Sequence, residues 1–252
     1  MTAAAAHDPG QPTVLITGAA KRVGAAIARQ LHAAGANILI HYMQSAADAD
    51  CLAAALNVVR PGSALTLAGD LLATATLPDL VQRAVAAFGR LDVLINNASS
   101  FYPTPLGTIT EAQWDDLFGT NLKAPLFLAQ ASAPHLKATR GLILNLVDIH
   151  SQRPLPDHSV YCTAKAGLAM LTRALARELG PEIRVNGIAP GPVLWPEGGM
   201  DNDLQAKIIS RTALRRSGSP EDIAKAALFF FKDAPYVTGQ ILAVDGGRSI
   251  GW

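Results

Sequence analysis

The sequence predicts a doubly wound α/β fold, in which helices cover both faces of a mostly parallel sheet. Short apolar runs alternate with Ala- and Leu-rich amphipathic stretches of helix length along the chain. The runs are apolar on both faces, which is typical of parallel strands buried between two helical layers. At 252 residues, half of them hydrophobic, the chain is long enough for one sizeable core, and no linker or repeat divides it. We therefore expect a frayed, disordered tail at 1–12 and a single domain at 13–252.

Each predicted strand is a short apolar run bounded by helix-length segments. The first, VLIT, leads directly into a turn that contains glycine. The later runs recur at intervals that leave room for one helix, which favours parallel pairing. We predict strands at 14–17, 37–42, 64–70, 91–97, 142–148, 183–190 and 240–246.

The segments between the strands show amphipathic helical patterns. One irregular stretch, GPVLWPEGGMDND at 191–203, follows a strand end and is rich in proline and glycine. Loops at that end of a parallel sheet line the ligand crevice, so we interpret residues 191–210 as a mobile substrate loop. The helices are predicted at 22–34, 46–58, 76–88, 111–136, 159–179, 202–210 and 220–231.

Composition and charge exclude several classes of protein. Lys plus Arg number 21 and Asp plus Glu number 20, so the formal net charge of +1 creates no field that favours nucleic acid or an anionic membrane. Two cysteines are too few for a disulfide framework or a cysteine-rich metal site, which suits a reducing cytosol. The opening MTAAAAHDPGQP lacks the features of a signal peptide, and no segment approaches about 20 continuous apolar residues. We expect a cytoplasmic protein without a metal and with neither nucleic acid nor membrane as partner.

The first predicted strand ends in a turn that carries Thr17, Gly18 and Gly24. A tight turn with close helix packing would aim the N–H groups of the helix start at a pyrophosphate, assisted by the helix dipole. Strand-to-helix turns also use glycine for purely steric reasons, so this motif alone does not decide between the two interpretations.

The second predicted strand ends HYMQS, without the Asp or Glu that would hold the ribose 2′-hydroxyl of NAD. His41, Gln44 and Ser45 can donate hydrogen bonds to a 2′-phosphate. Lys21 and Arg22 add positive charge nearby. This pattern favours NADP(H) over NAD, and a solvated polar loop is the alternative.

Tyr161 and Lys165 are four positions apart in a predicted helix, so both side chains emerge on one face. A neighbouring ammonium favours tyrosinate and is expected to lower the pKa of the phenol from about 10. Tyr161 would then donate a proton near neutral pH. A surface pair is the common explanation of this spacing, but here it follows the glycine turn, NNA at 96–98 and Asn121 in FGTN. The conjunction indicates a catalytic group.

Together these motifs resemble the short-chain dehydrogenase/reductase family from about residue 13 to the end. The resemblance implies a Rossmann-type sheet that binds NAD(P)(H). It implies that Tyr161 is the proton donor or acceptor, that Lys165 binds the nicotinamide ribose and lowers the tyrosine pKa, and that Asn121 holds a proton-relay water. The matching residues are Thr17, Gly18, Gly24, Asn96-Asn97-Ala98, Asn121, Tyr161, Lys165, Pro190-Gly191 and the VDGG near the end.

Three departures from the usual family pattern resemble its pteridine reductase branch. Arg22 replaces the middle glycine of the turn, Ser99 follows NNA and precedes SFYPTPL, and Asp148 replaces the usual catalytic serine. The branch implies that Arg22 lies between a pterin edge and the cofactor pyrophosphate, where its planar fork of donors serves both. It implies that Phe101 stacks on the pterin and that Ser99 bonds the pterin or a cofactor phosphate. From the residues alone, Arg22 could be merely tolerated, and Phe101 with Tyr102 could anchor the loop.

Asp148 changes the chemistry expected of the site. A serine hydroxyl donates to a ketone oxygen, whereas a carboxylate only accepts unless it is protonated. Reduction of a C=N bond needs a proton at nitrogen, which Asp148, Tyr161 and Lys165 would deliver. A helix cap or a salt bridge is the alternative role of Asp148. Trp195 matches a substrate-lining position loosely, and core packing explains it equally well.

Two further departures concern the cofactor. The branch often has an arginine where this chain has Gln44, so the expected 2′-phosphate clamp has lost a charge. The threonine often found after Pro190-Gly191 is missing, so backbone groups would hold the nicotinamide amide. Asp70 either accepts from an adenine amino group or caps the following helix. With Lys165, the expected cofactor-binding residues are Thr17, Gly18, Lys21, Arg22, Val23, Gly24, His41, Tyr42, Gln44, Ser45, Asp70, Leu71, Asn97, Ala98, Ser99, Pro190 and Gly191.

The sequence thus predicts an NADPH-dependent reductase that transfers hydride to a C=N bond of a dihydropterin, of the dihydrobiopterin or dihydromonapterin type, with dihydrofolate as a poorer substrate. The alternatives are a carbonyl or 3-oxoacyl reductase of the same fold and a non-catalytic nucleotide-sensing protein. The family resemblance implies a homotetramer through the helices at 111–136 and 159–179. Ala164, Gly167 and Ala169 would allow close contact there, although packing within one chain explains them too.

Overall fold

The computed structural model describes residues 10–195 and 199–250. Its sheet contains seven parallel strands in the order β3-β2-β1-β4-β5-β6-β7, so the chain builds outward from β1 and then, from β4, in the opposite direction. This topology confirms the predicted doubly wound α/β fold. The strands are β1 Thr13–Ile16, β2 Asn37–Tyr42, β3 Ala64–Ala68, β4 Val93–Asn96, β5 Leu142–Leu146, β6 Arg184–Pro190 and β7 Ile241–Val244.

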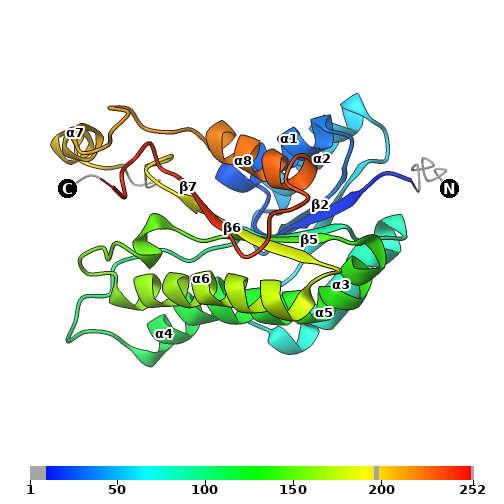
Figure 1. Cartoon of the computed structure of the whole chain (residues 1–252), viewed down its shortest axis with the longest axis horizontal. Coiled ribbons are helices and arrows are strands. Elements are labelled where there is room, and N and C mark those ends of the chain that lie inside the picture. Colours follow the sequence, from blue (N-terminus) through cyan, green and yellow to red (C-terminus); the bar gives the residue numbers. More distant parts are fainter. Residues whose placement is uncertain (1–9, 196–198, 251–252) are drawn as a thin grey trace.

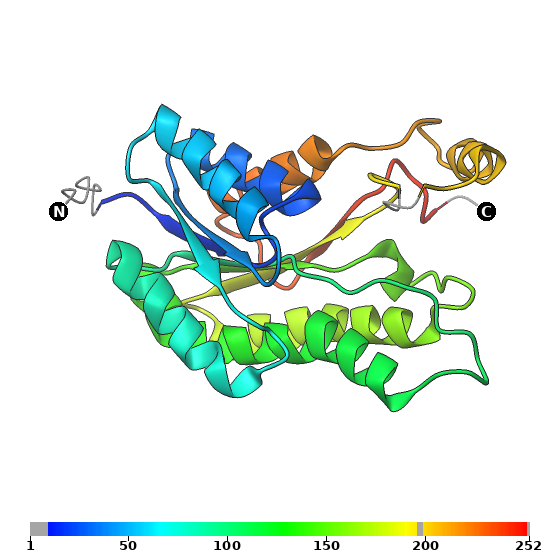
Figure 2. The same ribbon diagram turned by 180° about the vertical axis from the view of Figure 1, so that it is seen from behind.

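Helices cover both faces of the sheet (Figure 1). One layer contains α1, α2 and α8, and the other contains α3, α5 and α6, with α4 packed against α6. The reverse view shows the same two layers on either side of the strands (Figure 2). The helices are α1 Arg22–Ala33, α2 Ala46–Val59, α3 Leu77–Phe88, α4 Glu111–Phe118, α5 Ala124–Thr139, α6 Ser159–Leu179, α7 Asn202–Ser210 and α8 Pro220–Lys232, with shorter helical turns η1 Thr74–Thr76, η2 Gly119–Lys123 and η3 Ile149–Ser151.

Each central strand contributes to both layers because successive side chains of a strand point to opposite faces. In β1, Val14 and Ile16 pack into the cluster formed with α1, α2 and α8, whereas Leu15 packs into the cluster formed with α3, α5 and α6. All three side chains are fully buried. Burial of each contributes roughly 1.5–3 kcal/mol. β1 is therefore held between two core clusters, one on each face of the sheet.

The helix predicted at 111–136 is a longer run that extends to Thr139 and consists of α4, η2 and α5. Within η2 the hydrogen bonding is π-helical, and the N–H of Ala124 donates to the carbonyl of Gly119. The apolar periodicity that predicted the helix does not distinguish this wider turn from a regular one.

Some predicted strands end two residues early. β3 stops at Ala68 and β5 at Leu146. The residues that follow, including Asp70 and Asp148, have left the hydrogen-bonded ladder at the carboxyl edge of the sheet. Asp70 and Asp148, which the sequence places at the ends of predicted strands, are therefore loop residues at that edge.

The second half of the predicted substrate loop at 191–210 forms α7, which lies beyond the sheet at the end opposite the N-terminus (Figure 1). Residues 196–198 of this loop lie outside the described residues, as do residues 1–9 of the expected tail at 1–12. In the described part of the chain, no helix combines the length and apolar character needed to cross a membrane.

Candidate active site

A cavity of about 520 Å³ opens at the carboxyl edge of the sheet. β1 and β4, from which the sheet grows in opposite directions, both end at it, and this is where doubly wound sheets bind ligands. Its volume lies within the range of small-molecule sites, roughly 300–1,000 Å³. Among the predicted site residues, the cavity is lined by Gly18, Lys21, Arg22, Val23, Gly24, His41, Asp70, Leu71, Asn97, Ala98, Ser99, Asp148, Tyr161, Lys165, Pro190 and Gly191.

The predicted site residues and the residues that line the cavity are not the same set. Seven predicted residues do not line the cavity: Thr17, Tyr42, Gln44, Ser45, Phe101, Asn121 and Trp195. Nine residues that the sequence did not single out do line it: Met43, Leu72, Ser100, Asp116, Thr120, Leu146, Val147, Val193 and Leu194.

The Tyr161 hydroxyl donates to a carboxylate oxygen of Asp148 at 2.8 Å. Asp148 lies two residues beyond β5, and Tyr161 lies in the first turn of α6, so η3 between them folds the two side chains together. The other carboxylate oxygen accepts from the N–H of His150 at 2.7 Å, which caps η3. Asp148 is therefore both a cap and the hydrogen-bond acceptor of the tyrosine.

Lys165 lies one helical turn beyond Tyr161 and is 2% exposed. Its ammonium donates to the carbonyl of Leu146 at 2.8 Å and lies 5.7 Å from the centre of the Tyr161 ring. Burial lowers the pKa of Lys165 to about 8, and the nearby Asp148 carboxylate opposes that change. Because burial disfavours the charged form, Lys165 loses its proton at a lower pH than an exposed lysine does.

The pKa of Tyr161 moves in the direction opposite to the prediction. Burial raises this pKa well above its usual value of 10, and the charge and hydrogen bond of Asp148 raise it further, while the Ser99 hydroxyl acts in the other direction. The prediction of a lowered phenol pKa was wrong because it took the ammonium as the dominant neighbour. A carboxylate touches the hydroxyl, whereas the ammonium is directed at a carbonyl. Tyr161 is a neutral phenol that carries its proton at neutral pH.

Thr17 joins the turns that follow β1 and β4. Its hydroxyl donates to the carbonyl of Ile95 at 3.3 Å and accepts from the N–H groups of Asn97 and Ala98 at 2.9 and 3.0 Å. The amide of Asn97 donates to the carbonyls of Thr17 and Gly18 at 2.8 and 3.0 Å. Thr17 and the Asn97 amide therefore shape the cavity wall through its backbone.

Gly24 and Gly191 lie where the backbone approaches its neighbours too closely for a side chain. A Cβ atom on Gly24 would lie 2.6 Å from the carbonyl oxygen of Gly18, and one on Gly191 would lie 2.6 Å from the Cα of Asp245. The first turn of α1 also contains no acidic residue. The positive end of its dipole thus faces the cavity, and no acidic side chain of that turn opposes it, which suits a pyrophosphate.

Arg22 has a left-handed backbone, with φ of +54°. Such a conformation costs a non-glycine residue roughly 1–3 kcal/mol, which explains why glycine is usual at this position. The guanidinium lines the cavity and donates to the backbone carbonyl of Trp195 at 3.2 Å. A strained cation at a cavity is characteristic of a functional site. Trp195 contributes its carbonyl to this contact, and its indole does not line the cavity.

His41 has a different role from the predicted one. It is 1% exposed, its Nδ1 accepts from the N–H of Gly18 at 3.2 Å, and its Nε2 pairs with the carbonyl of Gly69 at 3.2 Å. Burial lowers its pKa to about 4, so the ring is neutral and both nitrogens are occupied. The expectation that His41 donates to a 2′-phosphate was wrong, because this ring braces the turn. Asp70 accepts from the N–H of Leu72 at 2.9 Å and so closes a local turn, while it also lines the cavity.

The end of β2 carries polar groups on an open surface. Lys21 forms an ion pair with Asp48 of α2 at 2.9 Å, and both side chains are about half exposed. Gln44 is exposed, and Ser45 begins α2 without a capping hydrogen bond from its side chain. The positive charge of Lys21 at this end of the cavity is thus partly balanced by a carboxylate.

Phe101 lies beside Tyr161 and is 49% exposed. Its ring meets that of Tyr161 edge to face, with centres 4.8 Å apart at 76°, and stacks on His158 at 4.8 Å and 20°. Phe101 is therefore in contact with the Tyr161 ring, although it does not line the cavity itself.

Asn121 braces the loop after β4. Its carbonyl oxygen accepts from the Ser99 hydroxyl at 2.7 Å, and its amide donates to the carbonyls of Ser100 and Leu117, both at 2.9 Å. Both N–H bonds are thus used within the protein. The side-chain amide therefore has no hydrogen left to donate to a water. The relay water stays a prediction.

The residues present fit a nicotinamide dinucleotide. Tight backbone contacts at Gly24 and Gly191 and the helix start at α1 suit phosphates, and the Tyr161–Lys165 pair faces the same cavity. Among the described residues, no cluster of three or more His, Cys, Asp or Glu side chains could hold a metal ion. The cavity therefore combines a helix start that suits phosphates with a phenol that carries its proton.

Comparisons with known proteins agree with this geometry. Residues 18–249 match the family described as Enoyl-(Acyl carrier protein) reductase. The chain is 39% identical to Pteridine reductase 1 of Leishmania tarentolae, over 96% of this chain and 98% of the relative. It is 35% identical to the Granaticin polyketide synthase putative ketoacyl reductase 2 of Streptomyces violaceoruber, over 98% and 99%, and 31% identical to a 3-oxoacyl-acyl-carrier-protein reductase of Staphylococcus epidermidis, over 93% and 98%. The chain therefore belongs to the short-chain dehydrogenase/reductase family of oxidoreductases, in which it resembles the pteridine reductase branch.

Proposed function

We propose that this oxidoreductase is an NADPH-dependent reductase of dihydropterins, which adds hydride to a C=N bond with Tyr161 as proton donor. The observation that carries the proposal is the 2.8 Å hydrogen bond from the Tyr161 hydroxyl to Asp148. A carboxylate at this place cannot donate to a ketone oxygen as a serine would, but it can accept from the N–H and amino groups of a pterin. The 39% identity to a pteridine reductase over almost the whole chain supports the same substrate class.

The side chains divide the work of proton delivery. NADPH, when bound, supplies the hydride. Tyr161 gives its proton to the ring nitrogen, and Asp148 orients the hydroxyl before the transfer. The buried Lys165 ammonium, 5.7 Å from the tyrosine ring, offsets the negative charge left on the phenol oxygen. Burial keeps the phenol protonated until substrate arrives.

Arg22 and Phe101 supply the recognition of a flat heterocycle in this proposal. The guanidinium of Arg22 bonds the pterin edge and the cofactor pyrophosphate, and this role accounts for its strained backbone. The Phe101 ring, edge to face with Tyr161, stacks on the pterin. NADP(H) is preferred because β2 ends without an acid and Lys21 lines that part of the cavity.

The test is steady-state turnover of dihydrobiopterin, dihydromonapterin, dihydrofolate and a 3-oxoacyl thioester, each with NADPH and NADH in parallel. Turnover of the pterins, faster with NADPH, is expected. Oxidation of NADPH with the thioester and no turnover of any pterin would remove the proposal. That result would favour the carbonyl reductase that the ketoacyl and oxoacyl reductase relatives suggest.

Two variants separate the proposal from its rivals. Asp148→Ser should impair pterin reduction, and an increase in carbonyl reduction instead would favour the carbonyl reductase. Tyr161→Phe should abolish turnover. A Tyr161→Phe variant with unchanged cellular effect would favour a nucleotide-sensing protein that keeps the fold without catalysis.

We also propose a cytoplasmic homotetramer that uses the outer faces of α5 and α6, where Leu126 and Met170 are 39% and 62% exposed. The small residues of α6 carry no weight in this proposal. Ala164 and Ala169 are buried, and a Cβ on Gly167 would lie 2.7 Å from the side chain of Leu122 in the same chain. Light scattering at micromolar concentration tests the assembly, and a monomer would contradict it.

A further inference from the structure

The loop after β4 is tied to the helical run α4–η2 on both sides of Phe101. Before it, the Ser100 hydroxyl donates to one carboxylate oxygen of Asp116 at 3.0 Å. After it, the Tyr102 hydroxyl donates to the other oxygen of the same carboxylate at 2.9 Å. Asn121 holds the carbonyl of Ser100 as well. The side chains that flank Phe101 are thus directed into the helix, and the Phe101 ring is directed to Tyr161.

We propose that Asp116 is a positioning residue for substrate recognition: its carboxylate clamps Ser100 and Tyr102 and thereby sets the orientation of the Phe101 ring at the site. The inference rests on the proposed pterin reductase function, because Phe101 is the ring that we propose to stack on the pterin. It adds a residue that lies outside the predicted site and yet lines the cavity.

A carboxylate suits this geometry. Each oxygen accepts one hydroxyl, and hydrogen bonds to an ionised acceptor are shorter and stronger than those to a neutral one. An amide would keep one acceptor and turn its N–H₂ group toward the other hydroxyl, whose hydrogen would then be left with a longer contact: 3.4 Å to the Thr120 hydroxyl for Ser100, or 3.4 Å to the Gln113 carbonyl for Tyr102. Burial and the Asp116 carboxylate also raise the pKa of Tyr102 to about 12, so the Tyr102 hydroxyl keeps its proton and remains a donor.

The helix itself does not need an aspartate at this position. α4 is capped at its start by Thr110, whose hydroxyl and backbone N–H pair with Gln113 in a capping box. Asp116 lies in the last turns of α4, where an aspartate is unfavourable both for helix propensity and for the helix dipole. The hydrogen bonds of its carboxylate are to the loop, so we infer that Asp116 stabilises the loop rather than the helix.

The experiment measures kcat and KM for dihydrobiopterin in Asp116→Asn, with Asp115→Asn as the matched control. Asp115 is the exposed neighbour on the same helix, and its replacement removes the same charge. We expect Asp116→Asn to raise KM about 3- to 10-fold, the range that loss of one oriented aromatic stack would give, with a smaller change in kcat. Asp115→Asn should change neither constant.

A double-mutant cycle with Phe101→Ala tests whether Asp116 acts through the ring. We expect the two KM increases to be non-additive, because removal of the ring leaves the clamp nothing to orient. Unchanged KM in Asp116→Asn, or fully additive effects, would overturn the inference.

Controls keep the outcome clear. If Asp116→Asn does not fold by circular dichroism, Tyr102→Phe removes one arm of the clamp without altering the helix, and a rise in KM of about 2-fold or more is expected; no rise would overturn the inference. If the wild-type protein reduces no pterin, the proposed function fails and the clamp loses its substrate. If the wild type reduces pterins and both variants match it, only the clamp fails.

Discussion

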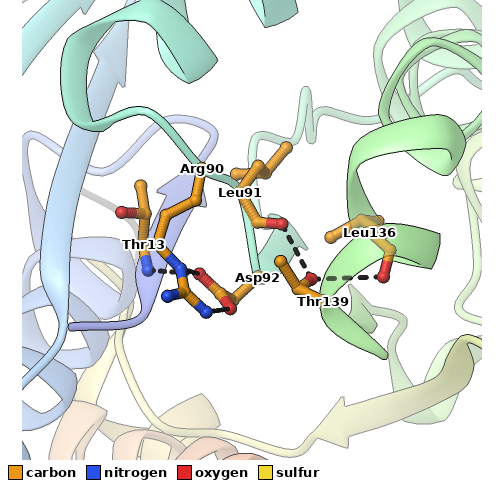
Figure 3. Close-up of polar contacts among 6 residues, drawn as sticks. All are labelled: Thr13, Arg90, Leu91, Asp92, Leu136 and Thr139. Carbon is orange, nitrogen blue, oxygen red and sulfur yellow. Dashed lines mark hydrogen bonds and ion pairs between the residues drawn. The ribbon is translucent and has the colours of Figure 1, made fainter. Parts of the chain in front are cut away.

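The amino and carboxyl edges of the sheet contain similar polar groups but use them differently. At the amino edge, a carboxylate bonds to a guanidinium and to a backbone N–H, and a hydroxyl bonds to backbone carbonyls (Figure 3). At the carboxyl edge, groups of the same kinds line a cavity of about 520 Å³. The difference shows that the fold gains stability at one edge and keeps reactive groups at the other.

Two separate groups of hydrogen bonds lie at the amino edge (Figure 3). Asp92 accepts from the N–H of Thr13 at 2.8 Å and from two nitrogens of Arg90 at 2.8 and 2.6 Å. The hydroxyl of Thr139, at the end of α5, donates to the carbonyl of Leu91 at 3.0 Å. These contacts join β1, β4 and α5, and they leave the carboxylate little capacity for a ligand.

At the carboxyl edge, two cationic residues have environments or backbone conformations that reduce the stability of the fold. Lys165 is buried with a lowered pKa, and Arg22 has a strained backbone. Both conditions reduce stability, and both place a cation at the cavity. The comparison therefore predicts that substitutions at the carboxyl edge impair catalysis without destabilising the fold, and that those at the amino edge destabilise the fold without impairing catalysis.

Tyr161→Phe should give the largest effect. Loss of a positioned proton donor lowers kcat by about 10²- to 10⁴-fold, whereas the melting temperature should stay within a few degrees because the ring remains. Steady-state kinetics with dihydrobiopterin and calorimetry measure the two effects. Tyr236→Phe, at a fully exposed ring, is the control and should change neither. Retained turnover would contradict the assigned role.

Lys165→Met should abolish efficient turnover and stabilise the fold. The folded-state pKa of about 8 lies below the usual 10.5, so the folded protein binds this proton less readily than the unfolded chain does. The cost is therefore fully present below pH 8 and disappears as pH rises to 10.5. We expect a gain of about 3 kcal/mol in unfolding free energy at pH 7 and none above pH 10.5, measured with urea.

The control for that experiment is Lys232→Met, an exposed lysine at the end of α8. It should leave the unfolding free energy unchanged at both pH values. A loss of stability in Lys165→Met at pH 7 would show that the amino and carboxyl edges do not differ as described.

Asp92→Asn at the amino edge should cost about 2 kcal/mol of stability, because the carboxylate accepts several hydrogen bonds that an amide cannot replace. KM and kcat of the folded fraction should equal those of the wild type. Urea denaturation followed by kinetics below the transition measures both. Glu182→Gln removes an exposed ion pair with Lys137 and should not move the urea midpoint. A change in KM for NADPH in Asp92→Asn would break the distinction between the edges.

Two glycine substitutions give the smallest and sharpest contrast. Gly89 has φ of +75° and open space around an added Cβ, so Gly89→Ala should cost about 1 kcal/mol and leave the kinetics unchanged. Gly24 has no room for a Cβ, so Gly24→Ala should raise the KM for NADPH about 10-fold, because the phosphate cradle must shift. NADPH titrations and melting curves compare the two. Equal kinetic effects would show that the cradle is not at Gly24.

Most of the fold was predictable because strands and helices leave strong periodic signals. Every predicted strand and helix is present, and the errors are at their ends. β3 and β5 stop early because residues such as Asp70 and Asp148 turn out of the sheet to reach the cavity. The π turn at η2 was not predicted, since it arises from backbone hydrogen bonding that side-chain periodicity does not record.

The site was predictable where a residue acts through its own chemistry and spacing. Asp148, Tyr161 and Lys165 meet as the motif implied. The roles of His41 and Asp116 were missed or mistaken because they depend on partners distant in sequence, Gly69 and Tyr102. The direction of the Tyr161 pKa also depended on burial, which local sequence does not reveal.

The wide turn η2 also fixes the length of the chain between the clamp and Asn121. A π turn accommodates one more residue than a regular helical turn. Deletion of Thr120 would leave a regular turn in place of the π turn, so α4 and α5 would join as an unbroken helix with almost unchanged relative phase. The extra residue therefore places Thr120 at the cavity without displacing the contacts of Asp116 on the preceding helix.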